Sequence, residues 1–171
     1  MKNIKALMLA VAAITLLTFN SCKKDNGDVP GASSNTISVK VDGKATLFNK
    51  EVVAASGAVS NSLFTSIQGK NADGGVISIV LNGAITAGKT FSNDAPNDDD
   101  KPLVMFTTKD EISFLNDDSS SNMVSVTITS VSGNKVKGTF KGGLTTVVFG
   151  NGTPETKSFT EGTFDVTLIK N

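Results

Sequence analysis

The chain of 171 residues contains no histidine, tryptophan, tyrosine or arginine, and it has a single cysteine. The absence of histidine removes the usual general base near neutral pH and the commonest ligand of transition metals. Without arginine, the sequence has no guanidinium group to hold a carboxylate or phosphate through two parallel hydrogen bonds. These absences argue against the common kinds of hydrolytic, transition-metal and phosphate-binding sites, and we expect no cofactor.

Charge and aromatic content argue against further classes of binding partner. The 16 lysines are matched by 16 acidic residues. Nucleic-acid binding depends on an excess of basic side chains that neutralise phosphates, so we expect no nucleic-acid partner. The rings of tryptophan and tyrosine commonly anchor protein partners. Their absence weakens a binding prediction without removing it, and the identity of any protein or glycan partner stays open.

The lone cysteine, Cys22, follows a short apolar segment near the start of the chain. Two lysines precede the almost wholly apolar run over 6–17. That length suits the apolar part of a secretory signal, which is about 7–15 residues. It is too short for a helix that crosses a hydrocarbon core of about 30 Å. We therefore predict a signal peptide over 1–21; the alternatives are a buried N-terminal helix or an ordinary signal with an incidental cysteine.

The residues around Cys22 resemble the processing site of a bacterial lipoprotein. Ser21 fits the small residue before the cut, whereas Phe19 and Asn20 depart from the familiar pattern. The resemblance implies that Cys22 carries lipid such as palmitate and anchors the protein to the outer membrane. Each buried methylene contributes about 0.8 kcal/mol, so more than one chain gives a stable anchor. The basic and acidic residues at 23–25 resemble a surface-export signal, but the sequence leaves open whether the domain faces outward or the periplasm.

The mature chain divides into two parts. Residues 22–35 are polar and rich in Gly, Pro and Ser, which indicates a flexible lipid-anchored tether with a reach of roughly 20 Å. Residues 36–171 form one domain, long enough for a core without disulfides. With Cys22 carrying lipid, no thiol remains for a disulfide or a zinc site.

Alternation of apolar and polar residues dominates the domain. It is clear over 37–41, 77–81, 124–128 and 164–168, and Asp42-Gly43 is typical of a tight hairpin turn. The sequence predicts an all-β fold of about 8–10 strands, either an antiparallel β-sandwich or a partly closed β-barrel. Val80 indicates a strand that is covered on both faces. The stretch 49–59 is ambiguous and is compatible with a helical turn.

Four segments carry a resemblance to a known family: 37–44 (ISVKVDGK), 67–69 with 75–81 (IQG, GVISIVL), 126–140 (VTITSVSGNKVKGTF) and 162–168 (GTFDVTL). Together they resemble the small Bacteroidetes lipoproteins grouped as a domain of unknown function of the DUF6252 type. The resemblance covers roughly 36–169 and implies a β fold in the cell envelope. It implies no catalytic residue.

The acidic loop over 93–101 is the strongest candidate for metal chemistry. Asp94, Asp98, Asp99 and Asp100 supply carboxylates of the kind that calcium binds with six to eight oxygens. The spacing does not match an EF-hand, because the turn glycine and the final glutamate are missing. The segment 116–118 supplies further oxygens if the fold brings the two loops together. The simpler interpretation is a solvated loop.

Weaker patterns are interpreted as structure. Ser132 and Lys135 match a serine-nucleophile spacing, but they flank a Gly-Asn pair typical of a hairpin turn. The segment 150–153 is glycine-rich without the lysine of a phosphate loop. Glu51, Glu111, Glu155 and Glu161 are scattered, which favours surface charges over a paired hydrolytic site. Most of the phenylalanines are expected to fill the core, and Phe64 is a candidate exposed contact.

The sequence therefore predicts a non-catalytic β domain on an envelope lipoprotein, which binds a ligand or serves a structural role. One alternative is a calcium-stabilised binding module at the cell surface. A second is a hydrolase with an unrecognised carboxylate site.

Overall fold

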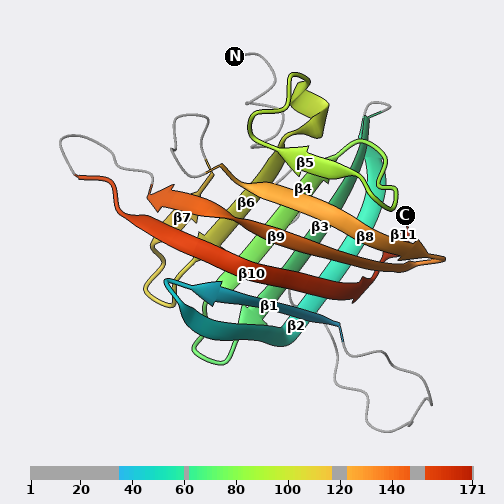
Figure 1. Ribbon diagram of the computed structural model, residues 1–171. Helices are drawn as coiled ribbons and strands as arrows, with labels where there is room; N and C mark the ends of the chain where they lie inside the picture. Colours follow the sequence, from blue (N-terminus) through green and yellow to red (C-terminus); the bar gives the residue numbers. More distant parts are fainter. Residues whose placement is uncertain (1–34, 60–61, 117–122, 147–152, 171) are drawn as a thin grey trace, which may run out of the picture. The chain divides into compact units, whose positions relative to one another are not determined.

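The computed structural model describes residues 35–59, 62–116, 123–146 and 153–170; the predicted signal peptide, Cys22 and nearly all of the tether lie outside them. The described chain forms strands and one short 3-10 turn (Figure 1). The elements are β1 Thr36–Val41, β2 Lys44–Val59, β3 Ser62–Asn71, β4 Val76–Asn82, β5 Thr90–Ser92, η1 Asp98–Asp100, β6 Pro102–Thr107, β7 Ser113–Leu115, β8 Ser125–Ser132, β9 Lys135–Thr146, β10 Thr156–Thr167 and β11 Ile169–Lys170. The all-β prediction is confirmed.

The sheet closes into a barrel of eight strands in the order β1-β2-β3-β4-β6-β7-β9-β10, and closure comes from β10 pairing with both β1 and β9. Adjacent barrel strands are antiparallel, while β11 pairs with β2 in parallel. Strands β7 and β8 share one edge of β9: β8 pairs along 135–141 and β7 along 145–146. β5 continues outward from β8. Of the two predicted closures, the barrel is the one formed.

The first hairpin has the predicted turn. Asp42 and Gly43 adopt φ angles of 51° and 80°, which the mirror-image turns of β-hairpins require. The segment 49–59 is a correction to the sequence prediction, because it belongs to strand β2 and not to a helical turn. The register of β2 against β3 shifts twice between Phe48 and Val53, and Glu51 has a φ of 50°. These bulges interrupt the alternation that identifies a strand.

The interior is filled by apolar side chains, including seven of the phenylalanines (Phe48, Phe91, Phe106, Phe114, Phe140, Phe159 and Phe164). Phe106 lies at the centre of an aromatic group, with ring centroids 6.1 Å from Phe48, 6.3 Å from Phe114 and 5.6 Å from Phe159. These rings come from β2, β6, β7 and β10, so they join opposite sides of the barrel. The prediction that phenylalanines form the core is confirmed for the described ones, apart from Phe64.

Strands β9 and β10 approach closely because glycines face phenylalanines across the seam. Gly138 pairs with Phe164, and Gly162 pairs with Phe140. A Cβ atom on Gly162 would stand 2.5 Å from the carbonyl oxygen of Phe140. Only glycine leaves room for the ring and the backbone at these positions, and glycine bends of this kind help a sheet to curve into a barrel.

Candidate functional site

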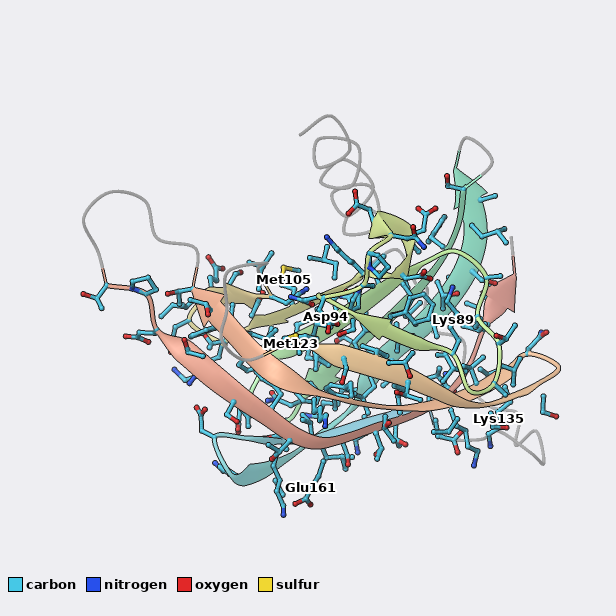
Figure 2. All side chains as sticks on the ribbon, turned by 45° about the horizontal axis from the view of Figure 1, so that its top comes forward. Lys89, Asp94, Met105, Met123, Lys135 and Glu161 are labelled. Carbon is cyan, nitrogen blue, oxygen red and sulfur yellow. The ribbon has the colours of Figure 1, made fainter. Side chains whose placement is uncertain are left out.

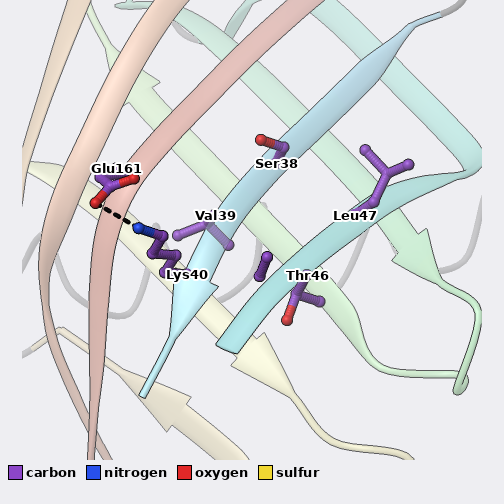
Figure 3. A pocket seen from close by; sticks show the side chains of 7 residues that line it. Ser38, Val39, Lys40, Thr46, Leu47 and Glu161 are labelled. Carbon is purple, nitrogen blue, oxygen red and sulfur yellow. Dashed lines mark hydrogen bonds and ion pairs between the residues drawn. The ribbon is translucent and has the colours of Figure 1, made fainter. Parts of the chain in front are cut away.

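A depression of about 350 Å³ lies on the outer surface of the barrel, where β1 runs between β2 and β10. Its lining consists of Ser38, Val39, Lys40, Ala45, Thr46, Leu47 and Glu161. Figure 3 shows Lys40 and Glu161 together at one side and Leu47 across β1 from them. Leu47 is 49% exposed and points away from the core. The depression combines one ion pair, two hydroxyls and an apolar side chain.

A β-bulge forms one side of this depression. The register of β1 against β10 shifts between Ser38, which pairs with Thr163, and Lys40, which pairs with Thr160. Glu161 is the extra residue and has a φ of 54°, in the left-handed region that non-glycine residues seldom occupy. The bulge turns its carboxylate toward Lys40, and the Nζ to Oε1 distance is 2.7 Å.

The depression presents charged, hydroxyl and apolar side chains next to one another. Surface ion pairs such as Lys40–Glu161 contribute about 0–1 kcal/mol, so the pair can separate and bind other charges at little cost. The Ser38 hydroxyl lies 3.4 Å from the Thr163 hydroxyl. A second hydroxyl is not a base that could activate Ser38 as a nucleophile. The site therefore offers hydrogen bonds, opposite charges and one apolar contact. Sequence reasoning missed it, because the bulge leaves no distinct local pattern.

The acidic loop places two of its four candidate carboxylates beside lysines. Asp100 lies 2.9 Å from the Lys89 ammonium, and Asp98 lies 3.2 Å from that of Lys101. The hydrogen bond from Lys89, followed by that from Asn97, holds the pKa of Asp100 below its ordinary value. Among the residues that the structure describes, no three Asp, Glu, Cys or His side chains are grouped to hold a metal. Calcium binding here remains a prediction, and lysines already partner two of its four carboxylates.

The fold brings the acidic loop to the segment 116–118 through Asn116. Its Nδ2 donates hydrogen bonds to Asn93 Oδ1 at 3.0 Å and to the Pro102 carbonyl at 2.8 Å. Its Oδ1 accepts a hydrogen bond of 2.6 Å from the Val104 amide. Asn116 thus ties β6 to the loop that follows β5, and its side-chain oxygen is already used. Asp117 and Asp118 lie outside the described residues.

The weaker sequence candidates have structural roles. Ser132 and Lys135 pair across the β8–β9 hairpin, as expected for a turn, and the Lys135 ammonium lies 3.4 Å from Asp165. Lys135 is therefore paired at the surface and is not a desolvated base. Glu51 lies on β2, 3.9 Å from Lys70, on a different strand from Glu161. Residues 150–152 lie outside the described chain.

A second ionic group lies near the β1–β2 turn. The Asp42 carboxylate accepts hydrogen bonds from the Ser158 amide at 2.8 Å and from the Lys157 ammonium at 3.0 Å. Partial burial raises the pKa of Asp42, but these two partners outweigh it and hold the pKa below the ordinary value of 3.8. Lys157 also lies over the Phe114 ring, 5.2 Å from its centroid. The group fastens the first hairpin to β10.

Comparison with known proteins gives no relative: no protein-family model, curated sequence or solved structure matches this chain. The resemblance to Bacteroidetes lipoproteins therefore remains an expectation from the sequence. No helix within the described ranges is long and apolar enough to cross a membrane.

Proposed function

We propose that the chain is a bacterial envelope lipoprotein, anchored to the outer membrane through lipid on Cys22, whose barrel is a non-catalytic binding or structural module. The observation that carries the binding part is the filled interior. Side chains such as Phe106, Ile79 and Val166 occupy the space that a ligand-carrying barrel leaves open. A partner therefore meets the outer surface, and the depression beside Lys40 and Glu161 is the candidate contact.

The anchor is supported by the arrangement of the sequence. A charged start, an apolar run over 6–17 and a small residue precede the only thiol in the chain. The described barrel contains no cysteine, so its stability does not depend on that thiol. The polar segment before β1 supplies the spacer that a domain tethered to a membrane needs.

Labelling with an alkyne analogue of palmitate tests the anchor. The full chain, expressed in a bacterium that processes lipoproteins, is expected to incorporate the label and to lose it in Cys22→Ser. The control is Thr129→Cys in the Cys22→Ser background, which restores one thiol at an exposed strand position. Equal labelling of this control and the natural chain would show that labelling reflects thiol reactivity and not a processed lipoprotein site.

The contact site is tested by site-specific photo-cross-linking in the intact envelope. A photoreactive residue at Leu47 is expected to give a discrete product that the same residue at Thr139 does not give. Lys40→Glu should reduce its yield, since it places two carboxylates side by side. If Lys40→Glu leaves the yield unchanged, the depression is not the contact.

A further inference from the structure

The outer surface of the barrel has two chemically different halves. On β1, β8, β9 and β10, the outward side chains are Ser, Thr, Lys, Asp and Glu almost throughout. Many of them contact one another across strands: Lys137 lies 2.9 Å from Asp165, and the Thr90 and Thr127 hydroxyls are 2.9 Å apart. In Figure 1 these four strands form the near wall of the barrel. This half is polar and faces solvent.

The half formed by β2, β3, β4, β6 and β7 carries more apolar side chains on the outside, although polar residues and the Lys70–Glu51 ion pair also lie there. Two rows of outward residues cross it in register: Ala55, Ser66, Val80 and Leu103 form the first, and Val53, Gln68, Ser78, Met105 and Leu115 form the second. Neither row contains a charged residue. We call the six larger apolar side chains of this region the outer apolar face: Val53, Phe64, Val80, Leu103, Met105 and Leu115.

These side chains do not belong to the interior. Outward Val80 pairs with Leu103, whereas its inward neighbour Ile79 pairs with Val104 in the core. Val80 is buried although it points outward, in line with the sequence prediction of a strand covered on both faces. Val53 is 53% exposed, and Leu103, Met105 and Leu115 are half-buried. Figure 2 labels Met105 on the opposite side of the ribbon from Glu161. Val80, Leu103, Met105 and Leu115 lie next to one another, and Val53 lies on the same side of the barrel beyond Gln68 and Ser78. Apolar side chains gathered on the outside in this way mark a surface that contacts a protein or a membrane.

The position at which the described chain begins indicates that the outer apolar face contacts a membrane. The Asn35 side chain accepts a hydrogen bond from the Thr167 amide at 2.9 Å. Two residues later, Ile169 pairs with Ala55, the first member of the apolar row, and Ile169 is itself 58% exposed. The tether thus joins the barrel close to the border of the outer apolar face. Its expected reach of roughly 20 Å keeps that face at a high effective concentration beside the lipid, so weak contacts suffice.

We propose that the outer apolar face rests on the lipid surface in which Cys22 is anchored; this inference depends on the lipid anchor proposed above. Burial of the exposed parts of these side chains, Val53 above all, among headgroups and upper acyl chains stabilises the docked state in proportion to the apolar area covered, and Val80, which is already buried, adds little. The polar half, with the depression beside Lys40 and Glu161, then faces the solvent, where a partner can reach it. The two halves therefore have separate roles.

The absence of tryptophan and tyrosine makes this testable without background. Val53→Trp places one indole on the outer apolar face, and Thr139→Trp places one on the polar half as the matched control. The acylated chain is reconstituted in phosphatidylethanolamine–phosphatidylglycerol vesicles with and without brominated acyl chains. We expect bromine to quench the emission of the Val53→Trp variant and to leave that of the Thr139→Trp variant unchanged. Equal quenching of the two variants, or none in Val53→Trp, would overturn the proposal.

A second substitution links the effect to the face itself. Met105→Asp in the Val53→Trp background should abolish the quenching, whereas Thr139→Asp in the same background should preserve it. Both substituted side chains point outward from their strands. Circular dichroism and the Tm are measured to check that each variant folds. Persistent quenching in Met105→Asp would show that the face does not hold the domain on the lipid.

Flotation separates this inference from the proposed anchor. A chain that neither gains acyl mass nor floats with vesicles contradicts the anchor itself. A Val53→Trp chain that floats with its indole unquenched contradicts only the docking. In native envelopes, an indole at position 53 that is shielded from acrylamide but not quenched by bromolipid would show a protein on this face, which also refutes the lipid assignment.

Discussion

Gly138→Ala should destabilise the barrel at the seam that closes it. A Cβ at this position would stand 2.6 Å from the Thr127 carbonyl oxygen on β8 and 2.7 Å from Cε1 of Phe164 on β10. The oxygen belongs to the backbone of a paired strand, so it cannot move without disturbing the β8–β9 ladder. Overpacking of this kind costs about 1–3 kcal/mol. The reduced freedom of the unfolded chain returns only about 0.4–1 kcal/mol.

The expected net loss is about 1–2 kcal/mol, which lowers the Tm by roughly 3–8 °C for a domain of this size. Urea unfolding of the mature chain, followed by far-ultraviolet circular dichroism, measures the free energy directly. Gly57→Ala is the matched control, because its Cβ would meet only the Phe64 ring at 3.3 Å, on the outer surface. The reasoning is refuted if Gly138→Ala unfolds at the same urea concentration as the natural chain or as Gly57→Ala.

Three further outcomes are expected. Asn116→Ala should lower the free energy of unfolding by about 2–4 kcal/mol, because it leaves the Val104 amide without its acceptor and removes two donated hydrogen bonds. Asn97→Ala, at an exposed position, should lower it much less, and equal losses in urea unfolding would contradict the structural role of Asn116. The Asp42 pKa is lowered in the fold, so its stabilisation is present above the unfolded value of 3.8 and is lost as pH falls below it. The free energy of unfolding of Asp42→Asn should therefore fall less steeply with acid than that of the natural chain, and parallel curves would contradict this. The Tm measured with calcium should equal the Tm measured with a chelator, because lysines already partner Asp98 and Asp100. A clear rise of the Tm with calcium would support the calcium-stabilised alternative.

The sequence predicted those parts of the fold that local pattern controls. Alternation identified the strands around 37–41, 77–81 and 164–168, because side chains of a strand point to opposite faces in turn. Asp42-Gly43 predicted its hairpin, since these residue types tolerate the φ angles that the turn requires. The phenylalanines were assigned to the core because the chain has no other aromatic residue to fill it. The segment 49–59 was ambiguous in sequence, because two bulges interrupt its alternation.

Only the tertiary structure decided how the strands close and what lies outside. The pairing of β9 with β10 made the sheet a barrel, and no local pattern encodes which distant strands meet. The bulge at Glu161, the tie through Asn116 and the in-register apolar rows also depend on neighbours far apart in the chain. By itself, the sequence determined an all-β domain and predicted its lipid anchor. The register between strands decided which side chains face solvent together, because a shift of one residue moves every side chain to the opposite face.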